Sequence, residues 1–186
     1  PAEDYEFVVF VTPVGPYFKG GFKSTPFMLS RKYDRAAPLG TGNIKVGGNY
    51  AASMTATVES HDMGYSNVFY LDPKEKRYID ECGAANFFAI KGNAYLTPRS
   101  NSILPSITNR SLITLAEDMG MRIERRPISV DELGHFDECG ACGTAAVISP
   151  VSKIVDIEND ITYVFGDGNP GPKSTELYNR LRAIQL

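Results

Sequence analysis

Short apolar runs bounded by turn-forming residues recur along this chain, whereas only three longer segments have helical spacing. Runs rich in β-branched and aromatic residues predict strands, and they cover residues 5–14, 67–71, 78–79, 86–90, 94–97, 121–128, 146–148 and 161–165. Apolar residues three and four positions apart predict helices at 49–61, 109–119 and 174–184, with a short helical turn at 130–133. Because strands and helices do not alternate strictly, the pattern predicts an α/β or α+β body of mixed sheet and helices.

The bulk properties of the chain exclude several classes of protein. Its 186 residues are enough for one domain, and 42% hydrophobic residues are typical of a globular core. The net charge of -3 and the isoelectric point near 5.4 provide no basic surface for nucleic acid or an anionic membrane. The longest apolar run, 7–11, is far too short to span a bilayer, and no signal-peptide pattern opens the chain. We therefore expect a cytoplasmic protein that binds neither nucleic acid nor membrane.

Three cysteines leave two interpretations open. Cys139 and Cys142 form a C-x-x-C pair, and Cys82 stands apart. A structural zinc site typically uses four Cys or His ligands in two short-spaced pairs, and His61 and His135 do not supply a second pair. We expect no metal, and the pattern favours ordinary buried thiols over a redox-active pair.

Two ionisable residues lie among small neighbours that suit a ligand site. Lys45 precedes Gly47 and Gly48, which let a ligand approach closely, and a desolvated lysine amine can act as a Schiff-base nucleophile. Glu81 lies next to small residues and can pair with a cation in a pocket. A solvent-facing lysine and a surface glutamate are the ordinary alternatives, and the local sequence favours them.

Two other segments can hold an anion through backbone amides. Ile107 and Thr108 precede a predicted helix, whose N-terminus favours a phosphate group. Residues 143–146 form another run of small residues with free amides. Thr108 as an ordinary N-cap is the alternative, so the residues by themselves indicate only possible anion sites and one candidate amine.

An ordered series of motifs runs along nearly the whole chain. In sequence order they are Pro13-Val14-Gly15-Pro16-Tyr17, Arg35-Ala36-Ala37-Pro38, Gly40-Thr41-Gly42, Lys45, Gly47-Gly48-Asn49-Tyr50-Ala51, Glu81 with Asn86-Phe87, Thr97-Pro98, Leu104-Pro105-Ser106-Ile107-Thr108, Glu124-Arg125-Arg126, and Gly143-Thr144-Ala145-Ala146 followed by Pro150-Val151. Each motif is weak alone, but the series resembles the branched-chain amino acid aminotransferases among the fold-type IV pyridoxal-phosphate enzymes. The resemblance implies that residues 1–186 form the α+β large domain of such an enzyme.

The resemblance implies roles for three side chains. Lys45 would hold pyridoxal 5'-phosphate as a Schiff base and, once displaced by an amino acid, would move a proton between substrate and cofactor carbons. Glu81 would keep the pyridine nitrogen protonated, so that the ring acts as an electron sink. Tyr50 would form a hydrogen bond with the phenolic oxygen of the cofactor.

The resemblance also implies where the phosphate and the substrate bind. Ile107, Thr108 and Thr144 would hold the cofactor phosphate, and Thr144 with Ala145 would lie near the substrate carboxylate. The substrates would be leucine, isoleucine and valine, with 2-oxoglutarate as amino acceptor. A homodimer is expected for the full-length enzyme.

The chain departs from the family pattern at several positions. The phosphate turn of the family reads Leu-Pro-Gly-Ile-Thr-Arg, whereas Ser106 replaces the glycine here and Asn109 precedes Arg110. Cys142 stands where the motif often has serine, and the C-x-x-C lies earlier than the redox pair of some animal relatives. The resemblance implies that the small N-terminal domain of the family, which supplies a phosphate-binding arginine, and the extreme C-terminus are absent. We therefore expect these residues alone to be inactive.

Three rival functions remain open. A D-amino-acid aminotransferase and an aminodeoxychorismate lyase share the fold, the lysine and the glutamate. The runs 45–50 and 143–146 favour the branched-chain type over both. Outside the enzymes, a non-catalytic domain that binds a phosphate ligand is the alternative.

Overall fold

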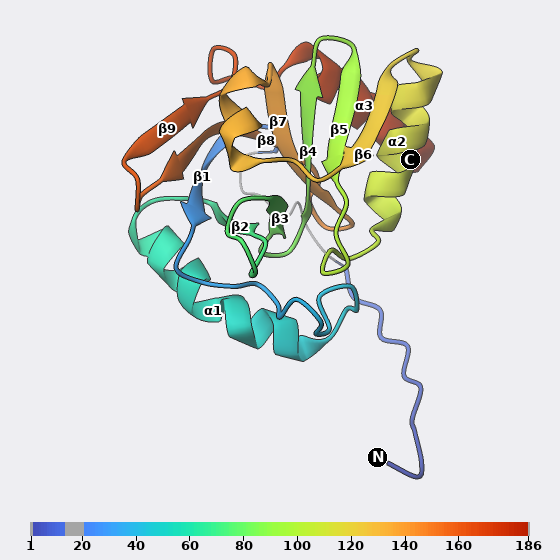
Figure 1. The fold of residues 1–186 in the computed structure, drawn as a ribbon. Coiled ribbons are helices and arrows are strands. Elements are labelled where there is room, and N and C mark those ends of the chain that lie inside the picture. Colours follow the sequence, from blue (N-terminus) through green and yellow to red (C-terminus); the bar gives the residue numbers. More distant parts are fainter. Residues whose placement is uncertain (1, 14–20, 186) are drawn as a thin grey trace.

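The computed structural model describes residues 2–13 and 21–185. In these ranges, nine strands form one mixed sheet, with helices packed around it (Figure 1). The strands are β1 (Thr25–Ser30), β2 (Asn67–Leu71), β3 (Ile79–Cys82), β4 (Asn86–Lys91), β5 (Ala94–Pro98), β6 (Arg122–Arg126), β7 (Glu138–Gly143), β8 (Val147–Asp156) and β9 (Ile161–Val164). The helices are α1 (Gly47–Asp62), α2 (Ile107–Asp118), α3 (Pro172–Gln185) and the short 3₁₀ helix η1 (Val130–His135).

The sheet closes on itself through a short pairing between β3 and β4. The strand order is β3-β2-β1-β8-β7-β4-β5-β6, and the additional β3–β4 pair joins six of these strands into a ring. In that closing pair Glu81 lies opposite Asn86. β1 runs parallel to both β2 and β8, whereas the other pairs within the ring are antiparallel.

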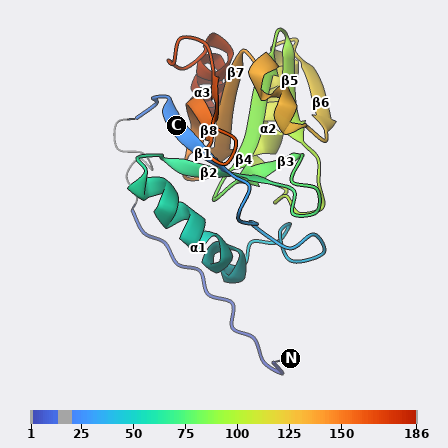
Figure 2. The same ribbon diagram turned by 60° about the vertical axis from the view of Figure 1, so that its left-hand side comes forward.

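Alternating side chains along each strand divide the core into three clusters. In β4, Phe87 and Ala89 belong to the cluster within the ring, while Phe88 and Ile90 face α2 and α3. A third, smaller cluster joins β1 and β2 to α1. Figure 2 shows α1 lying beneath the sheet, on a different side from α2 and α3. The two sets of helices therefore cover separate parts of the ring.

Helix α1 buries small side chains and leaves larger apolar ones exposed. Ser53, Ala56 and Ser60 are its buried residues, whereas Met54 and Val58 are exposed. Small buried side chains let a helix lie close to the sheet. The helix expected at 49–61 is confirmed, and its small side chains rather than its larger apolar ones face the sheet.

Most predicted elements occur at the expected places, and two strands were missed. The strand expected at 67–71 matches β2, and helices at 49–61, 109–119 and 174–184 overlap α1, α2 and α3. β1 was missed because Pro26 reads as a breaker. The register shift between Thr25 and Pro26 accommodates this proline. β7 was missed because its glycines and cysteines carry no β-propensity signal.

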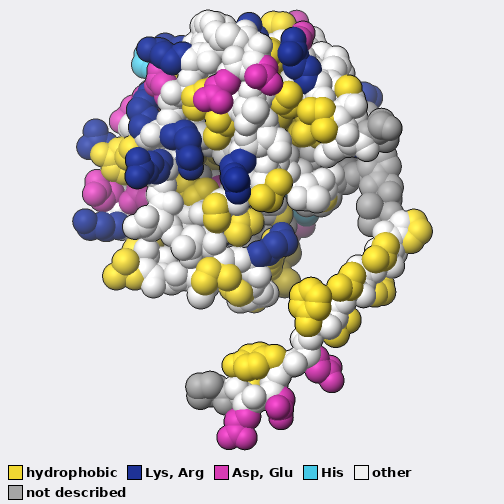
Figure 3. Space-filling model, turned by 90° about the vertical axis from the view of Figure 1, so that its right-hand side faces the viewer, with side chains coloured by type: hydrophobic (Ala, Val, Ile, Leu, Met, Phe, Trp, Pro, Cys, Tyr) yellow, Lys and Arg dark blue, Asp and Glu magenta, His cyan; other side chains and the backbone are white. Residues whose placement is uncertain are grey.

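The strand expected at 5–14 is wrong over its described residues. Residues 5–13 form no strand, and Val14 lies outside the described residues. The side chains of Phe7 and Phe10 are 94% and 83% exposed, and Figure 3 shows apolar side chains along this projecting segment. β-propensity cannot produce a strand without a partner whose backbone completes the hydrogen bonds.

The two cysteines of the C-x-x-C pair lie on opposite sides of β7. Cys139 belongs to the cluster within the ring together with Cys82, whereas Cys142 packs in the cluster under α2 and α3. A spacing of three residues in a strand places side chains on opposite faces. All three thiols are free and buried, as expected. Burial raises the pKa of each thiol.

Within the described residues, none of the helices combines the length and hydropathy that a membrane-spanning helix needs.

Candidate active site

A pocket of about 520 Å³ lies where four segments of the chain meet. Lys45 and Tyr50 come from the loop before α1 and from its first turn, and Glu81 comes from β3. The turn that precedes α2 and the turn at 143–146 between β7 and β8 complete the lining. Because these segments are far apart in the sequence, the fold alone brings them together.

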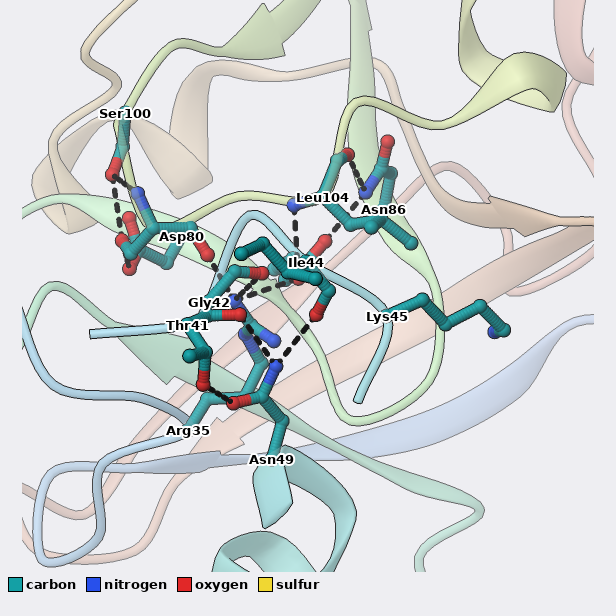
Figure 4. A network of polar contacts seen from close by, with 12 residues as sticks. Arg35, Thr41, Gly42, Ile44, Lys45, Asn49, Asp80, Asn86, Ser100 and Leu104 are labelled. Atoms are coloured by element: carbon teal, nitrogen blue, oxygen red, sulfur yellow. Dashed lines mark hydrogen bonds and ion pairs between the residues drawn. The ribbon is translucent and has the colours of Figure 1, made fainter. Parts of the chain in front are cut away.

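Lys45 is tethered through its amine to the phenol of Tyr50. Nζ of Lys45 donates a hydrogen bond to Oη of Tyr50 at 2.8 Å, and it lies 5.4 Å from the centre of the tyrosine ring. The lysine side chain is exposed, so the described residues do not provide the desolvation that the sequence argument invoked. Figure 4 shows Lys45 extending away from the polar network of Arg35 and Asn49, and Lys45 is part of the pocket lining.

Asn49 in the first turn of α1 holds the lysine loop in place. Its Nδ2 donates to the carbonyl oxygens of Thr41 and Ile44 at 2.8 and 2.9 Å, and its Oδ1 accepts from the Thr41 hydroxyl at 2.9 Å. Both Thr41 and Ile44 precede Lys45 in this loop. The backbone that carries Lys45 is therefore fixed to the helix that carries Tyr50.

Glu81 is the buried carboxylate of the pocket. Its Oε1 lies 2.9 Å from Nη2 of Arg35, and its Oε2 accepts a hydrogen bond from Nδ2 of Asn86 at 2.5 Å. The amide of Leu104 also points to Oε1, at 3.4 Å. Burial raises the pKa of Glu81 to about 7, although Arg35 acts in the opposite direction. A carboxyl group in a pocket whose pKa is shifted by burial and by a specific charge partner is a candidate functional group.

The N-terminus of α2 presents free amides to the pocket. Ser106 is the N-cap, and its hydroxyl accepts a hydrogen bond from the amide of Asn109. Ser106 has a φ of -63°, so this turn does not require the glycine of the family motif. In the described part of the chain, the amides of Ile107 and Thr108 have no partner. The interpretation of Thr108 as N-cap is wrong, because the helix begins at Ile107.

The turn between β7 and β8 forms another part of the pocket wall. Thr144 and Ala145 are exposed and line the pocket. Val147 has a φ of +57°, a left-handed conformation that is costly for a β-branched residue. Nearby, the hydroxyl of Ser149 is buried in the lining and has no hydrogen-bond partner among the described residues. Such strain and such an unpaired group are frequent at functional sites.

Six of the seven residues predicted for the site line this pocket; they are Lys45, Tyr50, Glu81, Ile107, Thr144 and Ala145. Thr108 is the exception, since it lies one residue further into α2 and is buried. Arg35, Asn49 and Asn86 were not predicted as site residues. Arg35 and Asn86 contact Glu81, and their positions in the sequence give no signal of that contact.

Residues 2–154 match the model of the amino-transferase class IV family, so this chain belongs to that family. It is 49% identical, over an aligned length of 188 residues, to a branched-chain-amino-acid aminotransferase of Helicobacter pylori (strain J99), covering 100% of this chain and 54% of that protein.

Two solved structures show how far the likeness extends. The branched-chain amino acid aminotransferase of Escherichia coli superimposes with a TM-score of 0.82 and 30% identity, over 93% of this chain and 55% of that one. The branched-chain amino acid aminotransferase of Thermobaculum terrenum, in its PLP-form, gives a TM-score of 0.76 and 29% identity, over 87% and 50%. The expected fold of mixed sheet and helices is confirmed. The chain spans about half the length of the relatives that it matches.

Proposed function

We propose that this chain carries the pyridoxal 5'-phosphate site of a branched-chain amino acid aminotransferase. The reaction would transfer the amino group of leucine, isoleucine or valine to 2-oxoglutarate. The observation that carries the proposal is the meeting of Lys45, the buried Glu81 and the N-terminus of α2 around one pocket. The PLP-form of the Thermobaculum terrenum relative supports the choice of cofactor.

The pocket fits such a ligand in size and in chemistry. Its volume of about 520 Å³ lies within the range of small-molecule sites. The free amides of Ile107 and Thr108 suit a phosphate, and the unpaired Ser149 hydroxyl suits a polar group. Bound pyridoxal 5'-phosphate would supply an aldehyde carbon that condenses with amines and a ring that accepts electrons.

Each residue has a distinct part in this proposal. The amine of Lys45 would hold the cofactor covalently and, when freed, would move the proton between the substrate carbon and the cofactor carbon. Its hydrogen bond partner Tyr50 is placed to bind the phenolic oxygen. Glu81 would accept a hydrogen bond from the ring nitrogen, while Thr144 and Ala145, which line the same pocket, would face the substrate carboxylate.

The phosphate needs a cation that the described lining does not offer. The only cations among the described lining residues are Arg35 and Lys45. Arg35 is paired with Glu81, and Lys45 is the proposed amine. We propose that residues 1–186 form the large, cofactor-binding domain, and that in the longer relatives the remaining length completes the pocket. A homodimer and a cytoplasmic location stay predictions.

Titration with pyridoxal 5'-phosphate, followed by absorbance, tests the cofactor site. The chain should bind the cofactor saturably, and inorganic phosphate should compete because both need the amides at the start of α2. Glu81→Gln should weaken the binding of the cofactor, because it alters the contact with the ring. Inorganic phosphate should still compete with the cofactor in this variant. An absence of saturable binding by the folded chain would contradict the proposal.

Turnover tests the domain assignment separately. With cofactor, leucine and 2-oxoglutarate, these 186 residues alone should form no glutamate above a blank that lacks protein, because the proposed pocket needs the remaining length of the relatives. Glutamate formation that Lys45→Ala abolishes would show that the site is already complete.

A further inference from the structure

Arg35 occupies the centre of a buried network behind the pocket. Its side chain is almost fully buried, and Nη2 lies 2.9 Å from Oε1 of Glu81. The same nitrogen donates to the carbonyl oxygen of Gly42 at 3.1 Å and to that of Ser102. One guanidinium thus joins the lysine loop, strand β3 and the loop that leads to α2, as Figure 4 shows.

The charge of Arg35 also acts on a second carboxyl group, that of Asp80. Asp80, the neighbour of Glu81, is buried and accepts a hydrogen bond from the Ser102 hydroxyl at 2.5 Å. Burial raises the pKa of Asp80, whereas Arg35 lowers it. Because a buried carboxylate is costly without a positive partner, Arg35 favours the charged form of both carboxyl groups, together with the serine hydrogen bonds to Asp80.

The charge of Glu81 matters because of the group that it would contact. Under the proposed function, the Glu81 carboxylate and the ring nitrogen of the cofactor share one proton. A carboxyl group without Arg35 would hold that proton more tightly. A carboxyl group paired with Arg35 is a weaker base, so the proton resides on the nitrogen.

We propose that Arg35 is a positioning residue that lowers the proton affinity of the Glu81 carboxylate and thereby favours the shared proton on the ring nitrogen of the cofactor. This inference rests on the proposed function for its second half. Its first half, the control of Glu81 by Arg35, concerns this chain alone.

A purely structural Arg35 is the alternative, because its hydrogen bonds also join two loops. Two substitutions separate the possibilities. Arg35→Gln keeps a donor for the carbonyl groups of Gly42 and Ser102 but removes the charge. Arg35→Lys keeps the charge and loses the planar fork. A structural role predicts that both variants lose stability without a specific effect on Glu81.

A pH titration of the Glu81 carboxyl group by ¹³C NMR, without cofactor, tests whether Arg35 controls the pKa of Glu81. Arg35→Gln should raise the pKa of Glu81 by at least about one unit, since a neighbouring cation typically lowers a carboxyl pKa by that amount or more. In Arg35→Lys the pKa of Glu81 should stay closer to that of the parent. As a matched control, Asp80→Asn should lower the pKa of Glu81, because the Asp80 charge raises it. If Arg35→Gln does not fold, Arg35→Lys should still raise the pKa by a smaller, measurable amount. An unchanged Glu81 pKa in the variants that fold overturns the proposal.

The ¹⁵N chemical shift of labelled pyridoxal 5'-phosphate measures the second half. In the parent the ring nitrogen should be protonated. In Arg35→Gln its shift should move toward the unprotonated value, and Arg35→Lys should restore it. A nitrogen that stays protonated in Arg35→Gln overturns the placement of the proton. If the parent binds no cofactor, the proposed function fails, while the NMR titration of Glu81 still decides the role of Arg35.

Discussion

Nζ of Lys45 lies 2.8 Å from the phenolic oxygen of Tyr50, five residues further along the chain in the first turn of α1. The helix therefore sets the distance between the proposed amine and the proposed partner of the cofactor's phenolic oxygen. Asn49 bonds the backbone of the loop to the same turn, so the loop that carries Lys45 is held against the helix that carries Tyr50.

Removal of the Tyr50 hydroxyl should weaken the binding of the cofactor without preventing its covalent attachment to Lys45. Tyr50→Phe should lower the affinity for pyridoxal 5'-phosphate by about three- to tenfold, the usual effect of losing one hydrogen bond. Absorbance titration measures this change. Tyr5→Phe, at a position that is 83% exposed, is the control and should bind as the parent does. Equal affinities in all three proteins would show that the hydroxyl does not contact the cofactor.

Glu81 should make the stability of the chain depend on pH between about 4.5 and about 7. Its pKa is raised from 4.5 to about 7 in the fold, so stability is highest below pH 4.5 and is lost as the pH rises through 7. Relative to pH 4, the free energy of unfolding at pH 8 should fall by about 3 kcal/mol more in the parent than in Glu81→Gln. Denaturant unfolding at several pH values measures both. Parallel pH profiles would contradict the raised pKa.

Only glycine fits at position 42. A Cβ there would collide with the carbonyl oxygen of Ser102 and approach Nη2 of Arg35. Gly42→Ala should therefore lower the free energy of unfolding by about 1–3 kcal/mol, the range for overpacking. Gly47→Ala is the matched control, because a Cβ at position 47 meets nothing within 4 Å and alanine favours the helix. Equal stability of the two variants would contradict the close contact.

The contribution of the Ser106 N-cap to the stability of the chain should be measurable by substitution. Ser106→Ala removes the acceptor for the amide of Asn109 and should cost about 1 kcal/mol in the free energy of unfolding, whereas Ser106→Gly should cost only a few tenths. Ser111→Ala, at a half-buried position within α2, is the control and should cost little, because the Ser111 hydroxyl bonds only to the carbonyl oxygen of Ile107 in the same helix. If Ser106→Ala matches Ser111→Ala, Ser106 does not cap the helix.

The three cysteines should behave as inert thiols. Because Cys139 and Cys142 lie on opposite faces of β7, no disulfide can join them while the strand is intact. Reaction with a thiol reagent should proceed only as fast as the chain unfolds. Rapid formation of a Cys139–Cys142 disulfide in the folded chain would contradict this geometry.

The sequence predicted the elements whose signals are local. Periodic apolar residues located α2 and α3, and the run 67–71 marked β2 to the residue. The closure of the ring was not predictable in this way, because it depends on a pairing of Glu81 with Asn86 that no period encodes. The strand expected at 5–14 was wrong because β-propensity is local, whereas a strand also needs a neighbouring strand to pair with. Residues 5–13 pair with no strand among the described residues.

In the candidate site, too, the sequence predicted the residues that belong to local motifs but not the long-range contacts between them. The ordered motifs brought forward Lys45, Tyr50 and Glu81, and these residues do meet around one pocket. Arg35 belongs to one of these motifs, but the sequence did not predict its role. Its contact with Glu81 joins positions that are 46 residues apart. Long-range ion pairs of this kind are set by the fold and leave no mark in the local sequence.

Borohydride reduction in the presence of pyridoxal 5'-phosphate, followed by peptide mapping, tests the central claim most directly. The account predicts that the cofactor label is trapped on Lys45 and is lost in Lys45→Arg, while exposed lysines such as Lys32 gain none at the same cofactor concentration. A cofactor that binds through its phosphate yet leaves Lys45 unlabelled would contradict the account and would indicate a non-catalytic phosphate-binding domain.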